Sequence, residues 1–236
     1  MNDDTKTHLV QPFRALRPAP RHAAEVAAPP YDVLNSDEAR ALAAGKPNSF
    51  LHISKPEIDL PEDTDAHAPE VYAKGAENMA RMISDGVLRR DERPSYYIYR
   101  VETHGHVQTG LAAGGSVAAY EANLIRKHEL TRPDKEDDRV AQIEAVGAHT
   151  GPVFTVHKPD AALAKIMKRG AAATPDYSAQ LGDVRHTVWT IDQRADIAGV
   201  TEAFDRLGVI YIADGHHRSA AAGRVAAARP DAPDQH

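Results

Sequence analysis

The chain has 236 residues, a formal net charge of -6, 42% hydrophobic and 26% charged residues, and no cysteine. This length and composition are typical of a globular protein with a sizeable core, and the negative charge argues against bulk attraction to nucleic acid. The lack of cysteine excludes disulfides, thiolate metal sites and cysteine nucleophiles. No apolar run approaches the roughly 20 residues that span a bilayer, and no secretory signal opens the chain. We therefore expect a cytoplasmic protein without a membrane partner.

The amino-terminal part is rich in proline. Residues 1–12 are polar, and we expect a loose terminus there, followed by a single domain over residues 13–236. The prolines in FRALRPAP and AAPPYDVL favour extended backbone. The side chain of Ser36 suits the N-cap of a following helix. In SFLHIS, residues 49–54, the alternation of apolar and polar residues predicts a short strand.

The middle of the chain alternates predicted helices and strands. An apolar stripe with a proline in the first turn predicts a helix over Pro69–Ser84. SYYIYRV and VQTGLAAGGSVAAY predict a hairpin with ETHGH as its turn. Further elements are predicted as a strand within VGAHTGPVFTVH, a helix over Asp160–Lys168, a strand at VRHTVWTI and a helix at TEAFDRLG. Hairpins combined with crossover helices indicate an α/β or α+β fold with a mixed sheet.

The segment GVIYIADGHHRSAAAGRVAA predicts a strand that enters a helix through DGHHR, residues 214–218. Backbone N–H groups at a helix amino end are unpaired and lie in a positive dipole, which suits a phosphate. Gly215 lets the main chain approach a ligand, and Arg218 can bind two phosphate oxygens. His216 and His217 can donate from their ring nitrogens. The DGHHR turn therefore predicts a phosphate site.

Other interpretations of this turn stay open. Asp214 could hold Mg²⁺, accept a hydroxyl proton or simply cap the helix. In the last case the rest of the turn is a solvated helix start, which explains the pattern equally well. A zinc site on His216 and His217 is a weaker alternative, because neighbouring residues of a helix point about 100° apart.

The densest charged run is IRKHELTRPDKEDDR, residues 125–139, in which Thr131, Arg132 and Pro133 interrupt any single helix. Beside a phosphate site, cations would neutralise phosphate charge, and carboxylates would hold Mg²⁺ or orient an attacking hydroxyl. On spacing alone, however, a solvated surface is the favoured interpretation.

RKHELTRPDKEDDR and ADGHHR occur together with FRALRP, APPYDVL, SFLHISKPE and TGPVF. In these motifs and their order the chain resembles the DUF1015 family from about Phe13 to its end. The resemblance implies similarity to free-serine kinases and to their ParB/sulfiredoxin-like fold, a mixed sheet with flanking helices whose corresponding turn binds nucleotide phosphates. His216 stands at the place of the reactive cysteine of sulfiredoxin, so that chemistry is excluded. Family members usually continue beyond the DGHHR helix, and we expect the domain to be incomplete at its carboxyl end.

The function implied by this resemblance is a phosphotransferase that uses ATP or ADP with Mg²⁺ and acts on the hydroxyl of a small amino acid such as free serine. Glu129 would accept the hydroxyl proton, Asp214 and His217 are further catalytic candidates, and Asp214 and Glu136 would hold Mg²⁺. The residues expected to bind the nucleotide are Arg126, Lys127, Arg132, Arg139, Gly215, His216, His217 and Arg218. Tyr31 and Asp32 are expected near the pocket.

The alternatives to this enzyme are a ParB-like nucleotide-binding switch and a nucleotide-binding protein without catalysis. We expect a nucleotide and a small molecule as partners rather than a nucleic acid, and a homodimer is compatible with the sequence.

Overall fold

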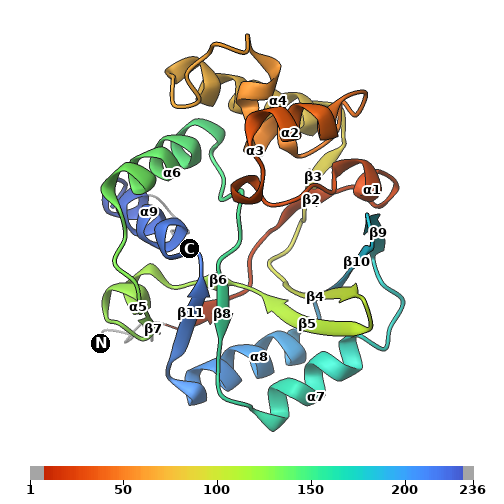
Figure 1. Cartoon of the computed structure of the whole chain (residues 1–236). Coiled ribbons are helices and arrows are strands. Elements are labelled where there is room, and N and C mark those ends of the chain that lie inside the picture. The colour runs from red at the N-terminus through yellow and green to blue at the C-terminus, as the bar shows by residue number, and fades with distance from the viewer. Residues whose placement is uncertain (1–7, 231–236) are drawn as a thin grey trace.

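The computed structural model describes residues 8–230, which form an α+β fold (Figure 1). A four-stranded antiparallel sheet has the order β5 (His106–Ala112), β4 (Tyr96–Thr103), β10 (Val184–Ile191) and β9 (Tyr177–Leu181). A three-stranded sheet has the order β7 (Ile125–Arg126), β11 (Ile210–Asp214) and β8 (Phe154–Val156). Two short pairs join β1 (Val10–Gln11) to β6 (Gly114–Gly115) and β2 (Leu16–Pro18) to β3 (Leu88–Arg90).

The helices lie around these sheets. The α-helices are α1 (Ala23–Val26), α2 (Ser36–Ala43), α3 (Leu51–Ser54), α4 (Pro69–Ser84), α5 (Val117–Glu121), α6 (Pro133–Val146), α7 (Ala161–Gly170), α8 (Arg194–Leu207) and α9 (His216–Ala227). The short 3-10 helices are η1 (Pro20–His22), η2 (Tyr31–Val33) and η3 (Pro56–Asp59). In Figure 1, α7 and α8 lie below the sheets, α2 to α4 lie above them, and α6 packs beside α9 on the left.

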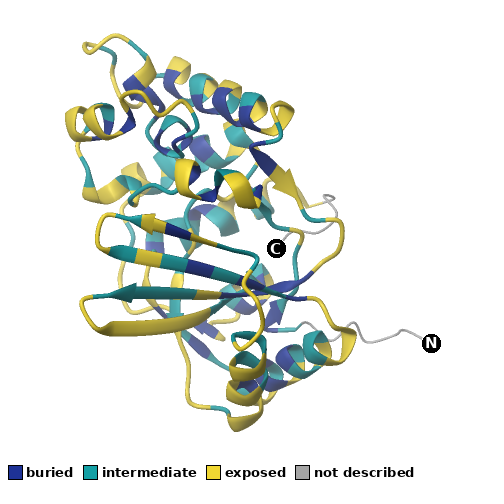
Figure 2. Ribbon diagram, turned by 90° about the vertical axis from the view of Figure 1, so that its right-hand side faces the viewer, coloured by how far each residue is buried: buried dark blue, intermediate teal, exposed yellow. Residues whose placement is uncertain are grey.

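The largest hydrophobic cluster joins both sheets to α7 and α8. Alternation along β4 and β10 places Tyr96 and Trp189 on the covered face. Phe204 of α8 and Ile212 of β11 belong to the same cluster, so the two sheets share one core. Figure 2 shows the resulting pattern, in which buried positions recur along the central strands. The strand that leads to the DGHHR turn is therefore anchored in the main core.

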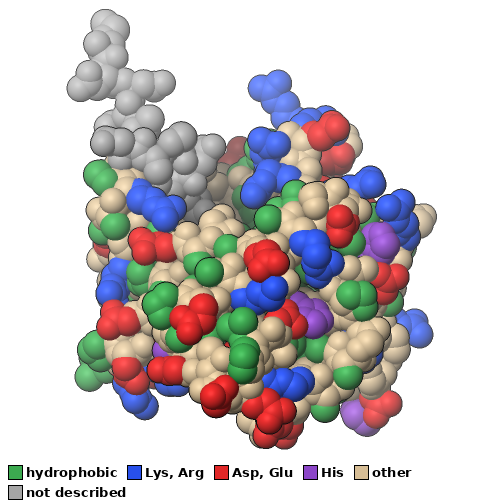
Figure 3. Space-filling model, turned by 90° about the horizontal axis from the view of Figure 1, so that it is seen from above, with side chains coloured by type: hydrophobic (Ala, Val, Ile, Leu, Met, Phe, Trp, Pro, Cys, Tyr) green, Lys and Arg blue, Asp and Glu red, His purple; other side chains and the backbone are tan. Residues whose placement is uncertain are grey.

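Helix α4 begins and ends where the sequence predicts, at Pro69 and Ser84. Its buried residues Met79 and Met82 belong to one hydrophobic cluster with Ile53 of α3. Seen from this side in Figure 3, acidic and basic side chains are interspersed over the surface.

Several local predictions need correction. SFLHIS contains the one-turn helix α3 rather than a strand, because Leu51 and Ile53 are buried in two different clusters, which one face of a strand would not allow. The N-cap of α2 is Asn35, one residue before Ser36, and it forms a capping box with Glu38. The segment over residues 116–120, predicted as part of the hairpin, enters α5 instead.

The amino-terminal segment also differs from the expected loose terminus. Residues 1–7 of that prediction lie outside the described residues. Leu9 and Val10, however, are 4% exposed and belong to the main core, and β1 pairs with β6. Among residues 8–230, no helix combines the length and the apolar character that crossing a membrane requires.

Candidate functional site

The DGHHR turn connects β11 to α9 through a residue in the left-handed region. Gly215 has φ 95° and ψ 30°, a backbone conformation that a side chain makes costly. It also lies under the side chain of Arg218, since a Cβ on Gly215 would come within 3.1 Å of the Arg218 Cζ atom. The conformation thus favours glycine, and a side chain there would also displace the Arg218 guanidinium slightly.

Parallel pairing of β7 with β11 brings the second polar cluster to this turn. Ile125 is the register partner of Ile210, and Arg126 is the partner of Tyr211. Because parallel strands end at the same edge of a sheet, the residues after Arg126 leave the sheet beside the DGHHR turn. Residues 127–132, here called the site loop, form this connection before α6 begins. The two clusters expected to act together therefore lie side by side.

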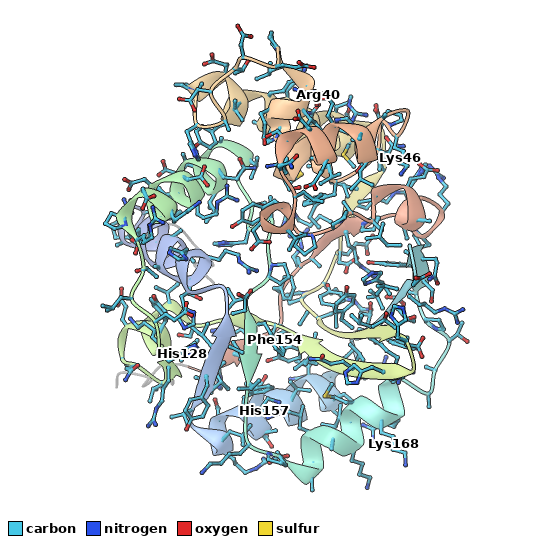
Figure 4. All side chains as sticks on the ribbon, in the orientation of Figure 1. Arg40, Lys46, His128, Phe154, His157 and Lys168 are labelled. Atoms are coloured by element: carbon cyan, nitrogen blue, oxygen red, sulfur yellow. The ribbon has the colours of Figure 1, made fainter. Side chains whose placement is uncertain are left out.

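Both histidines of the turn accept a backbone hydrogen bond from the site loop. The amide of His128 donates to Nε2 of His216 at 3.4 Å, and the amide of Arg132 donates to Nε2 of His217 at 3.1 Å. Two loop amides four positions apart are thus bound to consecutive imidazoles at the start of α9. Figure 4 labels His128 on the segment beside β11.

His216 differs from the rest of the site in its burial. It is 3% exposed, whereas the side chain of Glu129 is 59% exposed. Nδ1 of His216 lies 3.3 Å from Oε2 of Glu129, and the His128 ring packs edge-on against the His216 ring with centroids 4.4 Å apart. One buried imidazole therefore holds an exposed carboxylate at the edge of the sheet.

His128, Glu129 and His216 also form the one group within residues 8–230 whose ligand atoms could together hold a metal ion, since these atoms lie within 4.8 Å of one another. An imidazole binds a metal through an unprotonated nitrogen. In His216, Nε2 already accepts the His128 amide, so the proton of the neutral ring belongs on Nδ1, which faces Glu129. With the proton on Nδ1, this nitrogen faces the Glu129 carboxylate as a donor and is not free to bind a metal ion.

Arg218 links two other segments to the turn. Its guanidinium donates to Oδ2 of Asp214 at 2.5 Å and to the carbonyl oxygen of Pro152, and it lies 4.0 Å from the carboxylate of Asp32. Gly151 leaves room for its aliphatic stem, because a Cβ there would be 3.2 Å from Arg218 Cδ. Pro152 reaches this position since β8 pairs with β11, with Phe154, labelled in Figure 4, opposite Asp214. The cation is thereby held over the first turn of α9.

A second anchored arginine lies between α6 and η2. The Arg139 guanidinium is 4.1 Å from the centre of the Tyr31 ring and binds Asp138 at 2.5 Å. Burial opposes the charge of Asp138, but Arg139 and hydrogen bonds from Tyr72 and His67 outweigh it and lower the pKa of this carboxyl. Burial raises the pKa of Tyr31. Helix α6 is thereby fixed to the PPYD segment next to Arg218.

The structure brings together most of the predicted site residues. Glu129, Asp214, Gly215, His216, His217 and Arg218 lie at one edge of the sheet. The side chain of Asp214 is 68% exposed, so the turn is open to solvent.

The remaining candidates have other partners. Arg126 lies over the ring of Tyr211 at 5.6 Å, and Lys127 lies over that of Tyr120 at 4.0 Å. Arg132 pairs with Asp134. Glu136 pairs with Arg224 at 3.3 Å, and Arg139 binds Asp138. Glu136 and Arg139 are therefore engaged away from Asp214.

Two contributors were not among the predicted site residues. His128 was part of the charged run without an assigned role, and Pro152 was part of TGPVF. A signal for Pro152 was present in the glycine–proline pair, which marks a rigid turn before a strand. Tyr31 and Asp32, expected near the pocket, lie against Arg139 and Arg218.

Comparison with known proteins identifies the family. Residues 10–236 match the family model described as "Protein of unknown function (DUF1015)". No curated protein and no solved structure matches the chain. Because the match extends over nearly all of the sequence, the chain belongs to the DUF1015 family.

Proposed function

We propose that this protein is a nucleotide-dependent phosphotransferase that acts on the hydroxyl of a small amino acid such as free serine. The observation that carries the proposal is the position of the Glu129 carboxylate, held by His216 at the amino end of α9. A carboxylate beside a phosphate-binding turn is the arrangement that phosphoryl transfer to a hydroxyl requires.

The phosphates of the nucleotide would lie on the first turn of α9. This helix has 12 residues. Its N-cap residue is Gly215, so no N-cap side chain binds the free N–H groups of the first turn. These N–H groups and the helix dipole favour an anion. Arg218 lies over the same turn and would exchange its contact with Asp214 for phosphate oxygens.

In the proposed reaction the hydroxyl oxygen of the acceptor attacks the terminal phosphorus. A new oxygen–phosphorus bond forms while the bond to the bridging oxygen breaks, which releases ADP from ATP or AMP from ADP. The hydroxyl proton passes to the carboxylate of Glu129, whose side chain is exposed to an incoming acceptor. Arg218 would stabilise the charge on the transferred group.

Of the two carboxylates expected to hold Mg²⁺, Asp214 fits better. It is exposed and ends β11 at the phosphate-binding turn, and Arg218 would leave it on binding phosphate. Glu136 is paired with Arg224 and its side chain is only 17% exposed. A Mg²⁺ ion held by Asp214 would neutralise phosphate charge.

The proposal is tested by separating binding from turnover. Titration calorimetry with ATP and ADP measures binding, and phosphoserine formation from L-serine measures turnover. We expect Glu129→Gln to bind nucleotide as the wild type does but to lose turnover by at least about 100-fold, the contribution of a general base. Glu144→Gln, an exposed position on α6, is the matched control and should keep both.

Normal turnover by Glu129→Gln would contradict the assigned base. Absence of nucleotide binding by the folded wild-type chain would contradict the phosphate site. Nucleotide binding without phosphoserine formation, joined by nucleotide-dependent binding of labelled duplex DNA, would favour the switch instead.

A further inference from the structure

We infer that His216 is the positioning residue of this site: its imidazole orients the Glu129 carboxylate, and the His128 amide fixes the tautomer that makes this possible. The inference rests on the proposed function, in which Glu129 accepts a proton. It gives His216 a different role from that of a phosphate ligand.

His216 is much more buried than the residues around it. His216 is 3% exposed, while its neighbour His217 is half-buried and the site loop residues around Glu129 are exposed. A buried polar ring must have its nitrogens paired, since an unpaired buried donor or acceptor costs about 1–3 kcal/mol. The groups that face the two ring nitrogens of His216 therefore indicate its role.

The hydrogen bond from the His128 amide determines which ring nitrogen of His216 carries the proton. The His128 amide can only donate, so Nε2 of His216 must carry a lone pair. In the neutral ring the proton is then on Nδ1, which lies 3.3 Å from Oε2 of Glu129. The imidazole thus receives a hydrogen bond at Nε2 and faces the carboxylate with Nδ1, at an ion-pair distance of 3.3 Å. This is how histidine–carboxylate pairs fix the direction of a reactive group.

The two histidines also bind the backbone of the loop that carries Glu129. Its neighbour His128 is bound through its amide to His216, and Arg132 is bound through its amide to His217. The two histidines therefore hold the site loop at both ends of the stretch that contains Glu129. A turn with two consecutive imidazoles is explained by this arrangement, since each accepts one loop amide. Neither ring nitrogen of His216 is left for a phosphate.

Two isosteric substitutions test the role of each ring nitrogen. His216→Asn places an amide N–H where Nδ1 was, and His216→Gln places an amide group where Nε2 was and removes the donor to Glu129. We expect both variants to bind ATP and ADP with the affinity of the wild type. With L-serine as acceptor, we expect His216→Gln to lose about 10- to 100-fold in kcat, the range known for partners of reactive groups, and His216→Asn to retain more.

The tautomer of His216 can also be measured directly, without any turnover. Long-range proton–nitrogen spectra of protein with labelled histidine report the tautomer of each ring, and His216→Asn identifies the signal of His216 among the 13 histidines. We expect the Nδ1–H tautomer in the wild type and also in Glu129→Ala, because the His128 amide still donates to Nε2. Thermal unfolding of each variant shows whether it is folded.

The outcomes distinguish the possible roles. Weaker nucleotide binding in both folded variants would show that His216 is a phosphate ligand and would overturn the inference, as would an Nε2–H tautomer. Equal kcat in the Asn and Gln variants would also overturn it, because a role in packing alone does not separate them. If the wild-type chain forms no phosphoserine, the proposed function is contradicted. The tautomer measurement would then still test whether His216 directs an N–H group at Glu129.

Discussion

Tyr211 of β11 and Arg126 of β7 are register partners in a parallel pair, and this pairing places the site loop beside the DGHHR turn. Residues 88 positions apart, His128 and His216, come within hydrogen-bonding distance because the two strands end at the same edge. β11 itself is held in the main core through Ile210 and Ile212. Substitutions at the edge can therefore change the site while the sheet stays in place.

Arg218→Ala should weaken the binding of ATP and ADP. The guanidinium is held over the start of α9 and would contact phosphate through charged hydrogen bonds, which contribute about 1.5–3 kcal/mol each. A loss of this size corresponds to a rise in Kd of roughly 10- to 150-fold. Titration calorimetry measures the change directly.

The matched control is Arg224→Ala on the same helix. Arg224 pairs with Glu136 and Asp137, and its side chain is 45% exposed, so its removal should leave the nucleotide Kd unchanged. Equal loss in both variants would mean that only the overall positive charge of the helix matters. Unchanged binding in Arg218→Ala would remove the arginine from the site.

Gly215→Ala should destabilise the fold and impair nucleotide binding together. Its φ of 95° costs a residue with a side chain about 1–2 kcal/mol, and the new methyl group would press on Arg218. Gly208→Ala is the control, since Gly208 has φ 70° but open space around its Cβ position. We expect urea unfolding to show a loss of stability in both variants and calorimetry to show weaker binding in Gly215→Ala alone. Equal nucleotide affinities in the two variants would contradict this account.

Asp138→Asn should lower stability by about 1–3 kcal/mol at neutral pH, because a carboxylate paired with Arg139 and bound by Tyr72 loses its charge. The pKa of Asp138 is lowered by folding from its ordinary value of 3.8. Its charge therefore stabilises the fold above that value, and this contribution is lost as the pH falls through the folded pKa. The difference between wild type and variant should narrow below pH 3.8.

Urea unfolding between pH 7 and pH 3 checks this pH dependence. Asp137→Asn serves as the neighbouring control, since the Asp137 side chain is 66% exposed and exposed pairs contribute at most about 1 kcal/mol. A constant difference between wild type and Asp138→Asn at every pH would show that the charge of Asp138 is not the stabilising feature.

Much of the fold follows from local patterns in the sequence. The α4 helix is predicted over roughly its observed length because Pro69 opens it and an apolar stripe follows. The strand β10 is predicted over VRHTVWTI, a segment rich in β-branched residues. In contrast, α6 lacks a continuous apolar stripe, and its contact with Ile53 is made by the buried polar residue Gln142. A helix attached through hydrogen bonds leaves little trace in hydrophobic periodicity.

The site was predictable in part. The DGHHR turn could be placed at a helix amino end because strand and helix patterns flank it. The role of His128 could not, because it depends on a backbone amide, which every residue has, and on a strand pairing over a long separation. The contact between Arg139 and Tyr31 likewise depends on tertiary packing, which a charged run does not encode.

Arg139→Lys should lower stability by about 1 kcal/mol while the nucleotide Kd stays within about threefold of the wild type. The guanidinium binds Asp138 through two nitrogens and stacks on Tyr31, and a lysine ammonium can reproduce neither geometry. Arg132→Lys is the control, because Arg132 and Asp134 form an exposed pair whose loss should cost little stability. A rise in Kd of tenfold or more in Arg139→Lys, without a similar rise in Arg132→Lys, would place Arg139 on the phosphates instead. Urea unfolding and calorimetry on the same samples decide between the two.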